Sequence, residues 1–310
     1  MKTLLSTKDV AQLMRVTDTT IKRWSAEGKL PCVKTPGGHR KYQMKDVLQF
    51  SDEQSYPVAG IQLPDSPGID SERLEYDIHR KNYQPASAIV HDRALRGDRS
   101  GLLQLLTYLT KHQVSLATIG DQVIRPAMAR IGELSTEHRL ETNQEHIASQ
   151  ALLEAVIRLS PDLRRKPTNG LSAVCACAEG DFHEIDLRLL SYALECEGWN
   201  IRYLGANTPF ERLRSFLSTE RPQLLCFFFT LQRTETILEE IRSISALARS
   251  VHGASIVGGA SSGSMTRRDV SCDHIASSTQ DAIDFVRERF QLKPGPKKQR
   301  TAPPAEGLGS

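Results

Sequence analysis

The second half of the chain alternates short apolar runs with longer stretches in which apolar residues recur at helical spacing. The apolar runs are 171–178, 200–206, 223–230, 254–259 and 274–277, and the helical patterns are 184–197, 210–219, 234–251 and 280–290. Strands that alternate with helices through short connections predict a doubly wound parallel sheet of the Rossmann or flavodoxin-like kind over residues 169–291. Sheets of this kind bind ligands beyond the carboxyl ends of their strands.

Residues 85–168 repeat apolar side chains at helical spacing only. The broadest apolar face is made of leucines: Leu102, Leu103, Leu105, Leu106 and Leu109. Roughly four helices fit this length, which predicts a four-helix bundle that caps the sheet domain. The preceding stretch, 51–84, begins rich in Pro, Gly, Ser and Asp and is predicted to be a linker. The basic, proline-containing tail, 292–310, is predicted to be disordered.

The first fifty residues predict two short helices joined by a tight turn. Ser6 and Asp9 have the spacing of a helix N-terminal capping box, and apolar residues follow at helical spacing. A second helix beginning near Asp18 turns Ile21 and Trp24 inward. Its outward residues are Thr19, Thr20, Lys22 and Arg23. A short helix with this polar surface is typical of the groove-reading element of a helix-turn-helix.

A glycine-tipped loop follows, Lys34-Thr35-Pro36-Gly37-Gly38-His39-Arg40-Lys41-Tyr42. A hairpin with a basic rim can lie against the phosphate backbone of DNA. The Gly-Gly-His-Arg-Lys-Tyr string resembles the wing of the MerR family of transcriptional regulators, and the likeness covers about residues 5–50. It implies a winged helix-turn-helix in residues 1–50 that binds a double-stranded DNA operator. The predicted DNA-binding residues are Thr19, Thr20, Lys22, Arg23, Lys34, Gly38, His39, Arg40, Lys41 and Tyr42.

Charge and composition agree with a nucleic-acid partner for this segment. Residues 1–50 hold ten Lys and Arg against four Asp and Glu, whereas the 310-residue chain has a net charge of only +3. No run approaches the roughly 18 apolar residues of a membrane span, and the first residues are too short an apolar run for a secretory signal. The six cysteines are scattered, several of them in strand-like runs. This pattern predicts reduced thiols and a cytoplasmic protein without a membrane partner.

Candidate ligand chemistry follows the first predicted strand of the sheet. Asp181 stands two residues before His183 in the strand-to-helix loop. A carboxylate that holds one imidazole nitrogen orients the ring and makes the other nitrogen a better metal ligand. The alternative is a loop histidine that caps the next helix. Cys175 and Cys177 share one face of a buried strand, so we expect them to be core residues rather than ligands.

Residues 85–290 resemble cobalamin-binding modules, which pair a four-helix cap with a doubly wound domain. Their signature is Asp-x-His-x-x-Gly, in which the His ligates cobalt from below and the Asp orients it. Other agreeing segments are Gly132-Glu133-Leu134, Glu145-His146, Glu197-Gly198-Trp199, Tyr203–Pro209 and Val257-Gly258-Gly259. The resemblance implies cofactor contacts from Asp181, His183, Glu145, His146, Thr230, Gly258 and Gly259, with His183 as the cobalt ligand. With the N-terminal segment, the chain looks like the CarH/CarA/LitR group of B12-dependent, often light-responsive repressors.

Several positions depart from that pattern. Asp186 replaces the signature glycine, where a charged side chain obstructs or repels the phosphate-bearing nucleotide tail of the cofactor. Phe228 stands where the third strand usually has a small residue, and its ring would fill the groove for that tail. Ser135 replaces the tryptophan of the cap. Thr136 replaces the upper-face histidine of light-sensing members, although His138 lies close by.

The sequence therefore predicts a ligand-controlled DNA-binding regulator, and we expect a repressor that acts as a homodimer or homotetramer. Adenosylcobalamin is the cofactor that the resemblance favours. A pocket remodelled for another tetrapyrrole-like or unrelated ligand, and a ligand-free module that mediates oligomerisation, stay open as alternatives. A corrinoid methyltransferase carrier or a mutase subunit would share the module. However, the remaining length leaves no room for a substrate-barrel domain, and no Ser-His-Asp order or P-loop occurs, so no catalysis is predicted.

Overall fold

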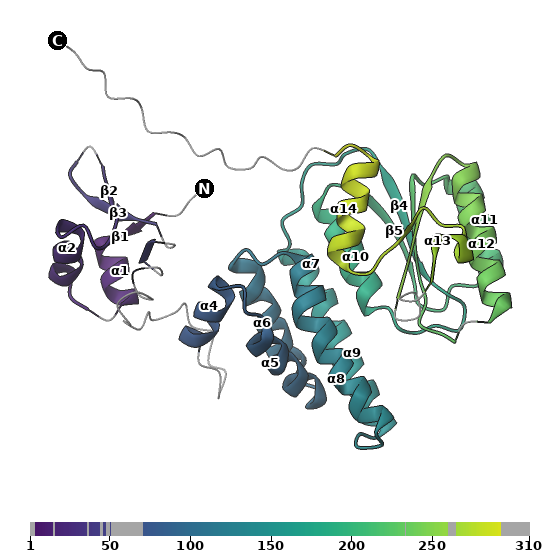
Figure 1. The fold of residues 1–310 in the computed structure, drawn as a ribbon, viewed down its shortest axis with the longest axis horizontal. Helices are drawn as coiled ribbons and strands as arrows, with labels where there is room; N and C mark the ends of the chain where they lie inside the picture. Colours follow the sequence, from purple (N-terminus) through teal and green to yellow (C-terminus); the bar gives the residue numbers. More distant parts are fainter. Residues whose placement is uncertain are drawn as a thin grey trace, which may run out of the picture. The chain divides into compact units, whose positions relative to one another are not determined.

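The computed structural model describes residues 4–292 apart from 15, 36, 44, 45, 48, 49, 51–70, 233 and 260–264 (Figure 1). Its contacts divide the chain into two compact units, one of residues 1–115 and 122–162 and the other of residues 116–121 and 163–310. The predicted disordered tail from 293 on, and the first part of the predicted linker, 51–70, lie outside the described residues. None of the described helices is long and apolar enough to cross a membrane.

The described residues of the head, residues 4–50, include two helices with complete bounds, further helical residues at 46, 47 and 50, and a three-stranded antiparallel sheet. Helices α1 (Thr7–Leu13) and α2 (Asp18–Ala26) precede the hairpin of β2 (Val33–Lys34) and β3 (Arg40–Tyr42), and β1 (Leu5–Ser6) pairs with the other edge of β3. The predicted capping box is present, since the Asp9 N–H donates to Ser6 Oγ (3.2 Å) and the Ser6 N–H donates to Asp9 Oδ2 (2.7 Å). The sequence pattern does not predict β1, because two residues are too few to show a period.

The side chains predicted to turn inward form the core of the head. Ile21 and Trp24 of α2 are buried, and Phe50 packs on Trp24 with ring centroids 4.9 Å apart. The other buried members are Val10, Ala11, Met14, Leu30, Tyr42 and Val47. The core therefore fixes which face of α2 is turned outward.

Residues 71–162 form helices throughout. They are α4 (Ser71–His79), α5 (Gln84–Leu95), α6 (Arg99–Lys111), α7 (Leu116–Thr118), the π-helical η1 (Ile119–Ile124), α8 (Arg125–Thr136), α9 (Thr142–Leu159) and the 3-10 turn η2 (Ser160–Asp162). The bundle of α5, α6, α8 and α9 confirms the predicted helical region. The predicted linker is wrong over 71–79, where α4 has the buried residues Leu74 and Ile78 on one face. Pro126 is the second residue after η1, and because proline has no backbone N–H it removes one hydrogen bond from the helical ladder there.

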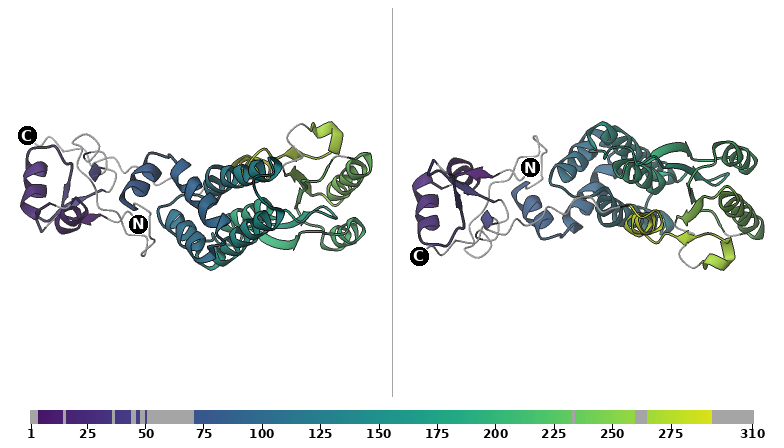
Figure 2. Two further views of the ribbon diagram at one scale, coloured as in Figure 1. Left: turned by 90° about the horizontal axis from the view of Figure 1, so that it is seen from below. Right: turned by 90° about the horizontal axis from the view of Figure 1, so that it is seen from above.

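The second unit contains the predicted parallel sheet. Its strands are β4 (Ser172–Cys177), β5 (Asn200–Gly205), β6 (Leu224–Phe228), β7 (Ala254–Gly258) and β8 (His274–Ile275), in the order β5-β4-β6-β7-β8 and parallel throughout. Its helices are α10 (Ile185–Cys196), α11 (Phe210–Glu220), α12 (Glu235–Ser250), α13 (Arg267–Val270) and α14 (Thr279–Arg289). The order confirms a doubly wound fold, whose layers can be followed in Figure 2.

The two faces of this sheet carry different side chains. Phe227 and Phe229 pack in a core cluster with residues of α11 and α12, including Leu213 and Ile241. Since side chains alternate along a strand, Phe228 points to the opposite face, which α10 covers through its contacts with β4 and β6. All three phenylalanines are buried, with exposed fractions of 1%, 7% and 0% for Phe227, Phe228 and Phe229.

The strand order reverses between β4 and β6. From β4 the chain passes to β5 on one side and then returns to place β6 on the other side of β4. The loops that follow β4 and β6 therefore leave the carboxyl edge of the sheet on the two sides of the switch point. Doubly wound sheets bind their ligands at this switch point, and the Asp181–His183 loop follows β4 directly.

Candidate functional site

The outward face of α2 presents the polar residues predicted to read DNA. Thr19, Lys22 and Arg23 are exposed, and Thr20 is half-buried. The hydroxyl of Thr17 caps the helix by accepting from the Thr20 N–H at 3.3 Å. Arg23 lies 4.0 Å from Glu27 with its side chain 65% exposed, so this ion pair leaves the guanidinium accessible to a phosphate or a base.

The predicted wing is a hairpin whose turn is closed by backbone hydrogen bonds. The Thr35 N–H donates to the His39 carbonyl at 2.9 Å, and the Gly38 N–H donates to the Thr35 carbonyl at 2.8 Å. Gly38 has a φ of 77°, which favours glycine at this position. Lys34 and Arg40 are register partners on β2 and β3, so their side chains share one face of the wing.

The wing thus brings together the basic residues that the sequence predicted to contact phosphates. Lys34, Gly38 and His39 are exposed, and Arg40 and Lys41 are half-buried. Tyr42 requires a correction, because its side chain is 0% exposed and belongs to the core. Its hydroxyl lies 2.8 Å from Ser25 Oγ, so Tyr42 joins β3 to α2 instead of facing DNA.

At the carboxyl edge of the sheet, Asp181 connects the loops that follow β4 and β6. It is completely buried, and it accepts hydrogen bonds from the His183 N–H (3.0 Å) and the Thr230 hydroxyl (2.9 and 3.0 Å to its two oxygens). The Thr230 N–H also donates to Oδ2 of Asp181. The loop after β5 supports the same segment, since the Asn207 N–H donates to the Asp181 carbonyl at 2.7 Å. Asp181 therefore joins, through hydrogen bonds, the two loops that lie on either side of the switch point.

The imidazole of His183 is oriented by this arrangement. Its Nδ1 lies 3.0 Å from Asp181 Oδ1 and 2.8 Å from Thr230 Oγ1, and its side chain is 70% exposed. Because the Thr230 hydroxyl donates its proton to the carboxylate, both neighbours of Nδ1 act as acceptors. The proton of a neutral ring therefore resides on Nδ1, and the lone pair resides on Nε2.

The ionisation of Asp181 strengthens this tautomer. Burial by itself raises the pKa of the carboxyl, but the hydrogen bonds from His183 and Thr230 outweigh burial and hold the pKa below its ordinary value. An ionised carboxylate on Nδ1–H is the arrangement that makes Nε2 a stronger metal ligand. The geometry therefore favours ligation by His183 over the alternative in which it only caps a helix.

Three side chains near His183 fix the start of α10, and only Tyr203 belongs to a segment that agrees with the cobalamin-binding pattern. Glu184 accepts from the Tyr203 hydroxyl at 2.6 Å and from Arg188 Nη2 at 3.3 Å. The Arg188 guanidinium carbon lies 3.3 Å from the centre of the Tyr203 ring. Burial, followed by the hydrogen bond to Glu184, raises the pKa of Tyr203. No spacing rule couples Glu184 on a loop to Tyr203 on β5, so the sequence gives no signal for this contact.

The carboxyl ends of β6 and β7 contain the residues that depart from the cobalamin-binding pattern. A methyl group at Gly258 would lie 2.6 Å from two carbons of the Phe228 ring, so the ring covers Gly258 closely. Gly259 has a φ of 103°, and a side chain there would meet the backbone of Phe229. Asp186 lies half-buried in the first turn of α10. This part of the edge does not fit a nucleotide tail, whereas the His183 side fits an axial metal ligand.

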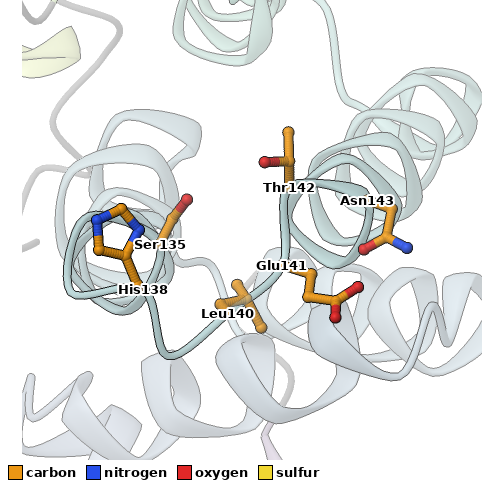
Figure 3. Close-up of a pocket in the computed structure, with 6 residues that line it drawn as sticks. All are labelled: Ser135, His138, Leu140, Glu141, Thr142 and Asn143. Atoms are coloured by element: carbon orange, nitrogen blue, oxygen red, sulfur yellow. The ribbon is translucent and has the colours of Figure 1, made fainter.

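In the helical unit, the predicted cofactor residues lie near the connection of α8 to α9. Glu145 is half-buried and accepts from Ser135 Oγ at 2.6 Å, and His146 is exposed. Thr136 donates to the Gly132 carbonyl at 2.9 Å. A pocket here is lined by Ser135, His138, Leu140, Glu141, Thr142 and Asn143 (Figure 3). Ser135 thus places a small polar group where the resemblance expects tryptophan.

The thiols of the sheet are core residues, as predicted. Cys175 and Cys177 are completely buried in β4. Contact with the Cys226 thiol and burial raise the pKa of Cys175, and burial raises the pKa of Cys177. These thiols therefore stay protonated at neutral pH and are poor nucleophiles.

Known families match the chain in three segments. Residues 4–55 match the family described as "Helix-turn-helix domain", and residues 90–160 and 171–281 match two families described as "B12 binding domain". The chain therefore carries a helix-turn-helix domain followed by the two parts of a B12-binding module, as the sequence motifs predicted.

Similar proteins include two transcriptional repressors. The HTH-type transcriptional repressor CarA of Myxococcus xanthus is 34% identical over 106 residues, which are 34% of this chain and 35% of that protein. The transcriptional repressor DcmR of Methylorubrum extorquens is 34% identical over 67 residues, which are 20% of this chain and 25% of that protein. The chain thus matches about a third or less of the length of these relatives.

A solved structure supports the fold. The monomethylamine corrinoid protein of Methanosarcina barkeri aligns with a TM-score of 0.58 and 18% identity, over 67% of this chain and 99% of that chain. At this identity the likeness concerns the fold, and it agrees with a helical region joined to a parallel α/β sheet.

Proposed function

We propose that the chain is a DNA-binding transcriptional regulator, acting as a repressor, whose assembly on DNA responds to a corrinoid bound through His183. The observation that carries the proposal is the presence in one chain of a basic, exposed α2 and wing and of a histidine oriented by a buried carboxylate at the switch point. Repressors among the similar proteins support the direction of regulation.

The head binds DNA with α2 in the major groove and the wing along the phosphate backbone. Thr19, Lys22 and Arg23 face the base edges, while Lys34 and Arg40 share the side of the wing that contacts phosphates. One head makes few base contacts. A homodimer or homotetramer therefore raises the effective concentration of heads and occupies an operator with repeated half-sites.

In the sheet domain, Nε2 of His183 would hold the metal, with Asp181 and Thr230 fixing the ring. When bound, a corrinoid would supply a cobalt ion for this nitrogen to coordinate. We propose the adenosyl form as the upper-ligand state, in keeping with the resemblance to light-responsive regulators. Glu145 and His146 are proposed as contacts of the helical cap, and Gly258 and Gly259 as backbone contacts at the end of β7.

Regulation follows from differential affinity. A ligand that binds one assembly state ten times more tightly than another shifts the assembly equilibrium by about 1.4 kcal/mol, which changes operator occupancy without any new contact to DNA. This role needs no catalysis, because the ligand acts through binding alone.

Two measurements on the full chain test the function. Fluorescence anisotropy with DNA from upstream of its own gene is expected to show binding that Arg23→Ala weakens at least tenfold. Incubation with adenosylcobalamin and with methylcobalamin in the dark, followed by desalting and visible absorption, is expected to show a retained corrinoid that is lost in His183→Ala. Absence of DNA binding would remove the regulator role, and a wild-type protein that stays colourless with these cobalamins and with a corrinoid lacking the lower nucleotide would remove the corrinoid.

A further inference from the structure

We infer that the ligand site selects a corrinoid without the lower nucleotide, of the cobinamide class, over complete cobalamin. The inference deepens the proposed function and rests on it, because it concerns the molecule that His183 ligates. It follows from what β6, β7 and the start of α10 place around the lower face of the ligand.

The two classes of corrinoid differ in the nucleotide on the lower face of the corrin ring. In complete cobalamin, a benzimidazole base and its sugar phosphate hang from the lower face of the corrin ring. This is the face that the Nε2 atom of His183 must approach. A protein that ligates cobalt through His183 therefore has to accommodate the displaced nucleotide near the carboxyl edge of the sheet, on one face or the other.

Both faces of β6 end in a phenyl ring. On the side of α11 and α12, Phe227 and Phe229 are buried in the core cluster with exposed fractions of 1% and 0%. On the opposite side, Phe228 lies over Gly258 so closely that even a methyl group there would come within 2.6 Å of two ring carbons. A base inserted beside β6 on either face therefore has to displace a packed aromatic side chain.

Charge acts against the phosphate as well. The N-terminus of a helix favours phosphate, because its free N–H groups point at the anion. In α10, however, this end carries the carboxylates of Glu184 and Asp186. Arg188 partly neutralises Glu184 through its contact at 3.3 Å. Asp186 lies three residues after His183 in the first turn of α10, so a second carboxylate stands at this end of the helix.

The contacts that orient the His183 side chain do not involve the part of the sheet edge that a nucleotide would occupy. His183, Asp181 and Thr230 are held by one another and by the backbone of the two loops, all at the switch point. A nucleotide-free corrinoid keeps the metal bond and avoids both Phe228 and Asp186. The residues present therefore fit the smaller ligand and oppose the larger one.

The test compares adenosylcobinamide with adenosylcobalamin on the full chain in the dark, by equilibrium dialysis with visible absorption. We expect adenosylcobinamide to bind at least tenfold more tightly, with a spectral change that His183→Ala abolishes. Equal or tighter binding of adenosylcobalamin would overturn the inference while leaving the proposed function intact. If the wild-type protein retains neither corrinoid, the corrinoid part of the proposed function fails, and this inference fails with it.

Adenosylcobalamin must release its internal base from cobalt at any histidine site. Variants of the protein therefore show how much of the affinity ratio between the two corrinoids comes from the protein itself. Phe228→Ala is expected to narrow the affinity ratio at least fivefold by tightening adenosylcobalamin alone. Phe285→Ala removes a ring of α14 that is stacked on His274 of β8, and as the matched control it should leave the affinity ratio unchanged. Asp186→Asn removes the negative charge of the carboxylate without leaving a cavity in the core. We expect it to tighten adenosylcobalamin binding, and this test stands even if Phe228→Ala fails to fold. An unchanged ratio in Asp186→Asn and in a folded Phe228 variant contradicts the inference.

Discussion

Asp181→Asn tests the arrangement that orients His183, because no orientation of an amide can satisfy the site. One carboxylate oxygen accepts from the His183 N–H, and the other accepts from the Thr230 N–H. An asparagine must place its NH₂ group against one of these two N–H donors, whichever way it is turned. The variant loses a charge-assisted hydrogen bond and leaves a buried donor unpaired, which together cost about 3 kcal/mol.

Urea unfolding of the sheet domain measures this cost. Of the two tryptophans in the chain, Trp24 lies in the head and Trp199 in the sheet domain, so in a Trp24→Phe background the fluorescence reports the sheet domain alone. Glu179→Gln is the control, because Glu179 in the same loop accepts from the Phe210 N–H near the surface and an amide oxygen can replace it. We expect a loss of about 3 kcal/mol for Asp181→Asn and less than about 0.5 kcal/mol for the control.

The pH dependence gives a second readout of the same substitution. The folded-state pKa of Asp181 lies below its ordinary value, so its ionisation stabilises the native state above the unfolded pKa of roughly 4. That contribution is lost as the pH falls through the folded-state pKa. The stability gap between wild type and Asp181→Asn should therefore shrink as the pH falls below about 4. A gap no larger than that of the control, or one that grows below about pH 4, would show that the ionised Asp181 does not stabilise this site.

Three further predictions follow from the geometry. Tyr42→Phe removes the hydrogen bond to Ser25, and we expect thermal unfolding of the head to show a loss of about 1 kcal/mol, with unchanged stability contradicting the structural role of this tyrosine. Lys34→Ala and Arg40→Ala should each lower the slope of log binding constant against log salt concentration by about 1 in anisotropy titrations, since each removes one phosphate contact; an unchanged slope would place the wing away from DNA. Because burial raises the pKa of Cys177, its thiol should react with a disulfide reagent at pH 8 at least tenfold more slowly in the native protein than in urea, and equal rates would contradict its place in the core.

The sequence predicts the periodic parts of this protein well, for physical reasons. Each strand of the sheet domain is a short apolar run bounded by turn residues, and parallel strands buried on both faces require such runs. The Ser6–Asp9 capping box and the Asp181–His183 spacing are local signals, so they can be read without tertiary structure. The helix α4 is missed because polar and proline-rich residues precede it and it spans only Ser71–His79.

Contacts between distant residues account for what the sequence does not predict. Tyr42 belongs to a basic, wing-like string, and only the packing of β3 against α2 shows that its ring is buried. Thr230 lies 47 residues from His183, and the strand order alone brings its hydroxyl to the imidazole. The alternation of Phe227, Phe228 and Phe229 between two faces also depends on which helices cover each face.

Ligand control of DNA binding through His183 is tested by measuring DNA binding and ligand binding in the same experiment. Anisotropy titrations of the full chain on upstream DNA are made in the dark without corrinoid, with adenosylcobinamide, and with adenosylcobalamin, for the wild type and for His183→Ala. We expect a corrinoid to shift the apparent DNA affinity of the wild type at least fivefold, and His183→Ala to bind DNA without responding to the corrinoid. A corrinoid response of the same size in His183→Ala, or no response in a wild-type protein that retains the corrinoid, would contradict ligand control through this histidine.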